Sequence, residues 1–149
     1  MTNYCYTGTR ETTYGQACKI QGTLALAAGE SYHVGDANGV DKLVRNYLTA
    51  TGKRVEIYHA EGRQPWQLAA RSKRMVDECA KLGNAKLLAY PNRPCPAGVK
   101  PGKNFNGRGS GTWGTIAYAK HLGLEIELVW LVPGLSEPEW MKQQQLSLL

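Results

Sequence analysis

Long apolar stretches are missing from this sequence. The most apolar run, residues 128–132, is strand-sized, whereas a membrane-spanning helix needs about 20 apolar residues. Residues 1–6 have neither the basic start nor the apolar core of a secretory signal peptide. The sequence therefore predicts a cytoplasmic protein without a membrane segment.

Cysteine is scarce and dispersed. The four cysteines are Cys5, Cys18, Cys79 and Cys95. No two of them stand at C-x-x-C spacing, and no histidine lies near them at the spacing of metal ligands. We therefore expect reduced thiols, no metal site and no cofactor.

Clusters of basic residues are also missing. The chain has 18 lysine and arginine residues against 12 acidic residues, a formal net charge of +6, but they form no continuous stripe. A positive balance suits an anionic ligand or a nucleic acid. Because the charges are scattered, a mostly solvated basic surface is favoured over a nucleic-acid track.

Strand-like and helix-like segments alternate along the chain. Its 149 residues, 42% of them hydrophobic, suffice for one buried core. The alternation predicts an α/β fold, a Rossmann-like three-layer αβα domain with a mostly parallel five-stranded sheet over residues 1–132. The expected strands are 4–7, 31–34, 54–58, 86–90 and 124–132, and the expected helices are 16–28, 40–48, 65–82 and 112–122.

Residues 133–149 are expected to form a C-terminal tail with a short helix. The tail begins with a Pro-Gly turn, and Ser136 and Glu139 have the spacing of a capping box. The helix would present Trp140 and Met141. These side chains would cover either the sheet or a partner subunit, which makes a homo-oligomer plausible.

Function is expected in the loops that follow the strands, because the carboxyl ends of parallel strands converge and ligands bind where the strand order reverses. After the first strand, Gly8, Thr9 and Arg10 offer a tight turn, a hydroxyl and a guanidinium. Residues 91–108 form a loop longer than compact domains usually tolerate. It is interpreted as a lid or as a mobile surface loop. Its cationic side chains include Lys100, Lys103 and Arg108.

A glycine-rich turn leads into the last expected helix. Its glycines permit close backbone approach, and the helix start offers unpaired N–H groups and a partial positive charge to an anion. Gly109, Gly111 and Gly114 also match the dinucleotide pattern G-x-G-x-x-G, although that fingerprint belongs after the first strand of a βαβ unit. The turn predicts a phosphate-binding loop at Gly109, Ser110, Gly111 and Thr112, with an ordinary glycine-rich loop as the alternative.

A second glycine-bracketed loop, Gly35 to Gly39, follows the second strand and includes Asn38. We expect it to contact the ligand. Asp36 lies near the strand end, where a carboxylate could accept hydrogen bonds from ribose hydroxyls, orient an attacking water as the catalytic residue, or cap the helix. Asp41 is interpreted as a helix cap.

Arg71 flanks the apolar stripe of the helix over residues 65–82. A partly inward charge needs a partner. A bidentate contact to a ligand phosphate or carboxylate would satisfy it, and so would a salt bridge to Asp36 or Glu61.

Aromatic and histidine side chains near these loops have two interpretations each. Trp66, Tyr90 and Trp113 could stack on a base or belong to the core or its rim. His59, at a strand end, could act as an acid or base, although a structural role is favoured.

Four short motifs together resemble a known family. They are Thr-Gly-Thr-Arg at residues 7–10, Gly-Asp-Ala-Asn-Gly-Val-Asp at 35–41, Trp66 followed by Ala-Ala-Arg at 69–71, and Ser-Gly-Thr at 110–112. In this order they resemble the SLOG superfamily of Rossmann-like domains, most closely its YspA-like branch. More distant similarity extends to the LOG phosphoribohydrolases and the DNA-processing protein A family.

The resemblance implies binding of a nucleotide or a nucleotide-derived ligand, as in a sensor or a sequestering protein. By position, it implies phosphate contacts from Gly35, Gly39 and the turn 109–112, with Arg71 beside them. LOG enzymes carry glutamates directly after the glycine-rich motif, one of them catalytic, whereas this chain has Trp113, Gly114 and Thr115. Whether the chain is an enzyme therefore stays open. The alternatives to a binding module are a LOG-like N-glycosidic or phosphoribosyl hydrolase using Asp36, and single-stranded nucleic-acid binding.

Overall fold

The computed structural model describes residues 1–107 and 109–142. Its centre is a five-stranded sheet in the order β3-β2-β1-β4-β5, and every neighbouring pair is parallel. This confirms the predicted Rossmann-like α/β fold, and the sheet is parallel throughout. The strands are β1 (Asn3–Gly8), β2 (Ser31–Gly35), β3 (Val55–Tyr58), β4 (Ala85–Tyr90) and β5 (Glu125–Leu128).

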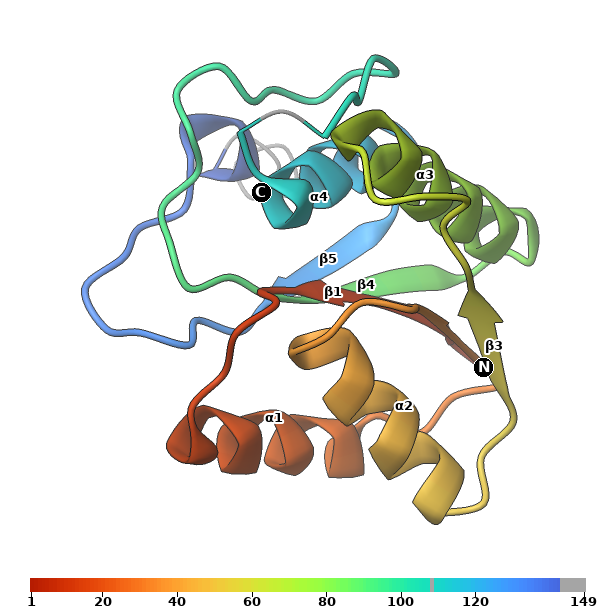
Figure 1. Ribbon diagram of the computed structural model, residues 1–149. Helices are drawn as coiled ribbons and strands as arrows, with labels where there is room; N and C mark the ends of the chain where they lie inside the picture. Colours follow the sequence, from red (N-terminus) through yellow and green to blue (C-terminus); the bar gives the residue numbers. More distant parts are fainter. Residues whose placement is uncertain (108, 143–149) are drawn as a thin grey trace.

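Four helices complete the three layers. Helices α1 and α2 cover one face of the sheet, and α3 and α4 cover the other (Figure 1). Across residues 1–107 and 109–142, no helix is long and apolar enough to cross a membrane. The helices are α1 (Tyr14–Leu26), α2 (Val40–Ala50), α3 (Pro65–Lys81) and α4 (Gly111–His121).

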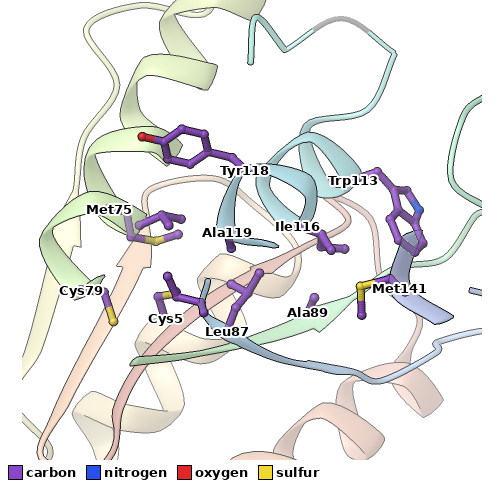
Figure 2. Packing of buried hydrophobic residues seen from close by; sticks show 12 residues of the cluster. Cys5, Met75, Cys79, Leu87, Ala89, Trp113, Ile116, Tyr118, Ala119 and Met141 are labelled. Carbon is purple, nitrogen blue, oxygen red and sulfur yellow. The ribbon is translucent and has the colours of Figure 1, made fainter. Parts of the chain in front are cut away.

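Alternating side chains of the central strands divide the core in two. In β1, Tyr6 packs beneath α1 and α2, whereas Cys5 points to the opposite face. In β4, Leu88 likewise packs beneath α1 and α2, and Leu87 points to the opposite face. Figure 2 shows the core cluster on the face that α3 and α4 cover, to which Cys5 and Leu87 belong. Burial on both faces explains why these strands read as apolar segments.

The strand order places a switch point between β1 and β4. The chain starts at β1 in the middle of the sheet, adds β2 and β3 on one side, and then adds β4 and β5 on the other. The loops that follow β1 and β4 therefore diverge at the carboxyl edge of the sheet. In sheets of this type a crevice forms at that place.

Helix α4 is buried on all sides over residues 113–119, because the segment between β4 and α4 runs around its outside (Figure 1). The indole N–H of Trp113 donates to the Arg93 carbonyl at 2.9 Å. Phe105 lies directly against Gly114, where a Cβ atom would overlap its ring. The long segment is thus an anchored wall of the domain over its described residues. Arg108 lies outside them.

The tail also packs against this wall. Residues 139–142 are helical, and Met141 belongs to the core cluster beneath α4 (Figure 2). The indole N–H of Trp140 donates to the Val99 carbonyl at 3.2 Å. The helix begins after Pro138, whose carbonyl accepts from the Met141 N–H, rather than after Ser136 as expected. Residues 143–149 of the expected tail lie outside the described residues.

Several predicted boundaries are wrong, by two to four residues. Helix α1 begins at Tyr14 rather than Gln16, because Thr13 and Gln16 form a capping box. Strand β5 ends at Leu128 rather than Val132. The chain nevertheless stays alongside β4, since the Val129 N–H donates to the Ala89 carbonyl at 2.8 Å.

Candidate functional site

A cavity of about 560 Å³ lies at the carboxyl edge of the sheet. It opens at the switch point, between the loops that follow β1 and β4, and is closed by α2, α3 and the start of α4. Its volume is within the usual range for small-molecule sites. We refer to it as the main cavity. Eight of the residues predicted to bind ligand line it, namely Gly8, Thr9, Arg10, Arg71, Gly109, Ser110, Gly111 and Thr112.

Most of the loop after β2 lies outside the main cavity. Gly35, Asp36, Asn38 and Gly39 are not among the residues that line the main cavity. A Cβ atom on Gly35 would lie 2.7 Å from Asp41 Oδ2 and 2.9 Å from Arg71 Cζ. The space beside Gly35 is therefore filled by the protein's own ion pair.

Gly39 and Gly8 also serve contacts within the fold. Gly39 has a φ of +71°, and a Cβ atom there would overlap the backbone of Arg10. A Cβ atom on Gly8 would lie 2.5 Å from the Val40 side chain. These glycines let the β1 loop and the start of α2 approach each other closely. They shape one wall of the site without offering open backbone.

Gly109 and Gly111 face open space instead. The nearest atoms to a Cβ on Gly109 belong to Pro96, 3.9 Å away, and none lies within 4 Å at Gly111. Both glycines line the main cavity. This is the stretch of the glycine-rich turn where a ligand can approach the backbone.

The N-terminus of α4 points its unpaired donors at this open stretch. Ser110 is the N-cap, and its hydroxyl accepts from the Trp113 N–H at 3.1 Å. The N–H groups of Gly111 and Thr112 have no hydrogen bond to any residue that the structure describes. Two backbone donors and the positive end of the helix dipole are therefore available to an anion.

Arg71 is buried, with 8% of its surface exposed. Its Nη1 donates to Asp36 Oδ1 at 2.8 Å and lies 4.0 Å from Asp41 Oδ2. Its Nη2 donates to the Ser72 hydroxyl at 3.3 Å, while Nε has no partner among the described residues. Arg71 therefore forms the expected salt bridge with Asp36. Its guanidinium nevertheless lines the main cavity.

Both carboxylate oxygens of Asp36 accept hydrogen bonds outside the main cavity. One oxygen accepts from Arg71 and the other from the Ala60 N–H at 3.2 Å, and His59 Nδ1 lies 3.6 Å away. Burial alone would raise the pKa of Asp36, but the hydrogen bonds from Arg71 and Ala60 outweigh it and hold the pKa below its ordinary value. Asp36 is thus an ionised structural partner of Arg71.

Asp41 is the carboxylate that faces the cavity from the protein interior. It is 6% exposed, lines the main cavity, and accepts from the Ala37 N–H at 3.3 Å. Burial raises its pKa, and the nearby Arg71, the Ala37 N–H and Arg45 only partly oppose this. The sequence contained the signal, because Asp41 shares the helical spacing of buried Val44 and Leu48.

Sequence reasoning missed further lining residues. Thr7 shares the face of Cys5 by the alternation of β1, and Ser72 precedes buried Met75 by three positions in α3. Both are buried and line the main cavity. Other lining residues that the sequence did not single out include Glu11, Arg63, Asn92, Arg93, Pro96 and Phe105.

Of the expected aromatic platforms, Trp113 lines the main cavity, but only 1% of its surface is exposed. Trp113 and Tyr90 are buried in the core clusters, and Trp66 is 64% exposed and outside the main cavity. Phe105 lines both the main cavity and a neighbouring cavity of about 430 Å³ under the β4–α4 segment. It is therefore the ring best placed to meet a ligand.

The fold and this cavity define a Rossmann-like α/β domain with a polar site at its switch point. Within residues 1–107 and 109–142, no group of three or more histidine, cysteine or acidic side chains could hold a metal ion. No protein-family model, no curated protein and no solved structure matches the chain.

Proposed function

We propose that the protein binds a nucleotide or a nucleotide-derived ligand in the main cavity, with a phosphate at the N-terminus of α4. This is the activity of a sensor or a sequestering protein. The proposal includes membership of the SLOG superfamily through its YspA-like branch, which the motifs of the sequence resemble. It rests on one observation: the open glycines Gly109 and Gly111 and the unpaired N–H groups of α4 border a cavity that also contains the Arg71 guanidinium.

The charge around the opening supports an anionic ligand. Arg10, Arg63 and Arg93 are exposed and line the main cavity, with Glu11 as the exposed carboxylate beside them. Converging positive charges raise the local concentration of anions and speed their association. An anion that has entered would then meet the N–H groups at the start of α4.

A LOG-like hydrolase is the less favoured alternative. Trp113, Gly114 and Thr115, which occupy the places of the LOG glutamates, are buried inside α4. Among the described residues, the carboxylates that line the main cavity are Asp41 and Glu11. A hydrolase would have to use one of these, because Asp36 is held by Arg71 outside the cavity.

The expected cytoplasmic location and homo-oligomer remain predictions. Single-stranded nucleic-acid binding also remains an alternative, since the arginines at the cavity mouth would suit a phosphate backbone. It predicts an affinity that falls steeply with salt concentration. A ligand enclosed in the cavity would depend on salt much less steeply.

Calorimetric titration of the protein with AMP, ADP, ADP-ribose and cyclic nucleotides tests the proposal. We expect at least one of them to bind at a single site. Replacing Arg93 with alanine should weaken that binding about two- to fivefold, because an exposed ion pair contributes up to about 1 kcal/mol.

Arg54→Ala is the matched control, since Arg54 is also exposed but does not line the main cavity. It should leave the affinity unchanged. The proposal fails if none of the compounds binds, or if Arg54→Ala weakens binding as much as Arg93→Ala. Tight binding of an oligonucleotide with a steep salt dependence, and no binding of mononucleotides, would favour the nucleic-acid alternative.

A further inference from the structure

The main cavity has a polar floor. It is formed by Thr7 from β1, Asp41 from α2, and Arg71 and Ser72 from α3. Each of these residues is less than a tenth exposed. Buried polar groups cost free energy unless they are hydrogen-bonded. A floor of this composition therefore suits a polar part of a ligand better than an apolar ring.

Charge is divided unevenly between the floor and the opening. On the floor, Arg71 is already paired with Asp36 at 2.8 Å and has a second carboxylate, that of Asp41, at 4.0 Å. The opening carries exposed arginines, and the α4 N-terminus adds its own positive end. A phosphate is therefore best placed at α4 and the opening, while the floor suits an uncharged group that donates hydrogen bonds.

Asp41 has the chemistry to receive such a group. Its Oδ2 is held by the Ala37 N–H at 3.3 Å and sits against Gly35, where the absence of a side chain makes room for it. A carboxylate has several acceptor positions and can receive two neighbouring hydroxyls. The hydroxyls of Thr7 and Ser72 add further donors and acceptors on the same floor.

We propose that Asp41, flanked by Thr7 and Ser72, binds the ribose hydroxyls of the nucleotide, so that the protein selects ribonucleotides over nucleotides that lack these hydroxyls. This rests on the proposed function, since it orients the same ligand: ribose towards the floor and phosphate at the N-terminus of α4. Asp36 follows β2 directly but cannot play this part, because it is bound to Arg71 and Ala60 outside the cavity.

The test compares AMP with 2′-deoxy-AMP and 2′,3′-dideoxy-AMP by calorimetry on the full chain. The unmodified protein should bind dideoxy-AMP at least about tenfold more weakly than AMP, because the missing hydroxyls leave buried polar groups without partners. Asp41→Asn should bring this ratio close to one. It should not weaken the binding of inorganic phosphate, which contacts α4 and not Asp41.

Two further variants keep the test decisive. Glu11→Gln removes the carboxylate at the opening and should leave the AMP to dideoxy-AMP ratio unchanged. Ser72→Ala should reduce the ratio partly, and it supplies the variant measurement if Asp41→Asn does not fold. Thermal unfolding of each variant checks folding.

The outcomes separate this inference from the proposed function. If AMP binds but the unmodified protein holds dideoxy-AMP equally well, the role of Asp41 is overturned while nucleotide binding stands. Equal weakening of AMP, dideoxy-AMP and phosphate by Asp41→Asn would also overturn it, because that pattern indicates a structural role. If neither AMP nor phosphate binds, both proposals fall.

Discussion

The two glycine-rich loops of this chain look alike in sequence, but they differ in what lies beside their glycines. In the loop after β2, the space beside Gly35 is taken by Asp41 and Arg71, and the space beside Gly39 by the β1 loop. In the turn before α4, Gly109 and Gly111 border open space in the main cavity. A glycine in a sequence thus predicts close approach by something, and only the tertiary structure tells whether it is the protein itself or a ligand.

The largest effect is expected at Gly39. Gly39→Ala should lower the free energy of unfolding by about 3–5 kcal/mol, because it combines backbone strain with overpacking. The residue has φ +71° and ψ −126°, and its Cβ would overlap the Arg10 backbone. Urea denaturation measures the change.

Gly52→Ala is the control for this substitution. Gly52 also has a positive φ, +76°, but nothing lies within 4 Å of its Cβ position. It should cost only about 1–2 kcal/mol, from the backbone alone. Equal losses at the two positions would mean that the β2 loop is not packed as closely as described.

A smaller effect is expected from breaking the ion pair of the same loop. The pKa of Asp36 is lowered in the folded protein, so its ionised form stabilises the fold above the unfolded-state pKa, near 4, and this contribution is lost as the pH falls through the folded-state pKa. Asp36→Asn should therefore cost about 1–2 kcal/mol at pH 7, below the cost for a fully buried pair because the side chain is 30% exposed.

Urea denaturation between pH 7 and pH 3 tests this prediction. The stabilities of Asp36→Asn and of the unmodified protein should converge as the pH falls below about 4. Glu61→Gln is the control, since Glu61 is exposed, and it should change little at any pH. A difference for Asp36→Asn that persists unchanged at pH 3 would contradict the role of its charge.

The smallest effect on stability is expected in the open turn. Gly111→Ala should change the free energy of unfolding by less than about 0.5 kcal/mol, because the methyl group meets no atom within 4 Å and alanine favours helix. It should nevertheless lower the affinity for AMP about fivefold or more, since the methyl group occupies space beside the phosphate position.

Gly22→Ala is the matched control, because Gly22 also lies in a helix with open space around it but does not line the main cavity. It should stabilise the protein slightly and leave AMP binding unchanged. If Gly111→Ala bound AMP like the unmodified protein, the turn before α4 would not be the phosphate site.

Much of the fold could be predicted from the sequence, because alternating apolar segments report directly on strands and helices. Predicted element boundaries were wrong where a local signal was overlooked, as with the capping box of Thr13 and Gln16 at the start of α1. For the site, the loops after β1 and β4 and the helical Arg71 were predicted, whereas the buried Thr7 and Ser72 were not. Which of Asp36 and Asp41 lines the cavity depends on how α2 and α3 pack against the sheet, and this tertiary packing is not visible in the sequence.

The anchored wall over α4 has a consequence for the order of assembly. One side of the main cavity comes from β1 at the start of the chain, and the other from α4, whose covering segment is held by Trp140. During synthesis β1 emerges long before α4 and Trp140. A ligand that needs both sides of the cavity would therefore stabilise the domain only once nearly the whole described chain is in place.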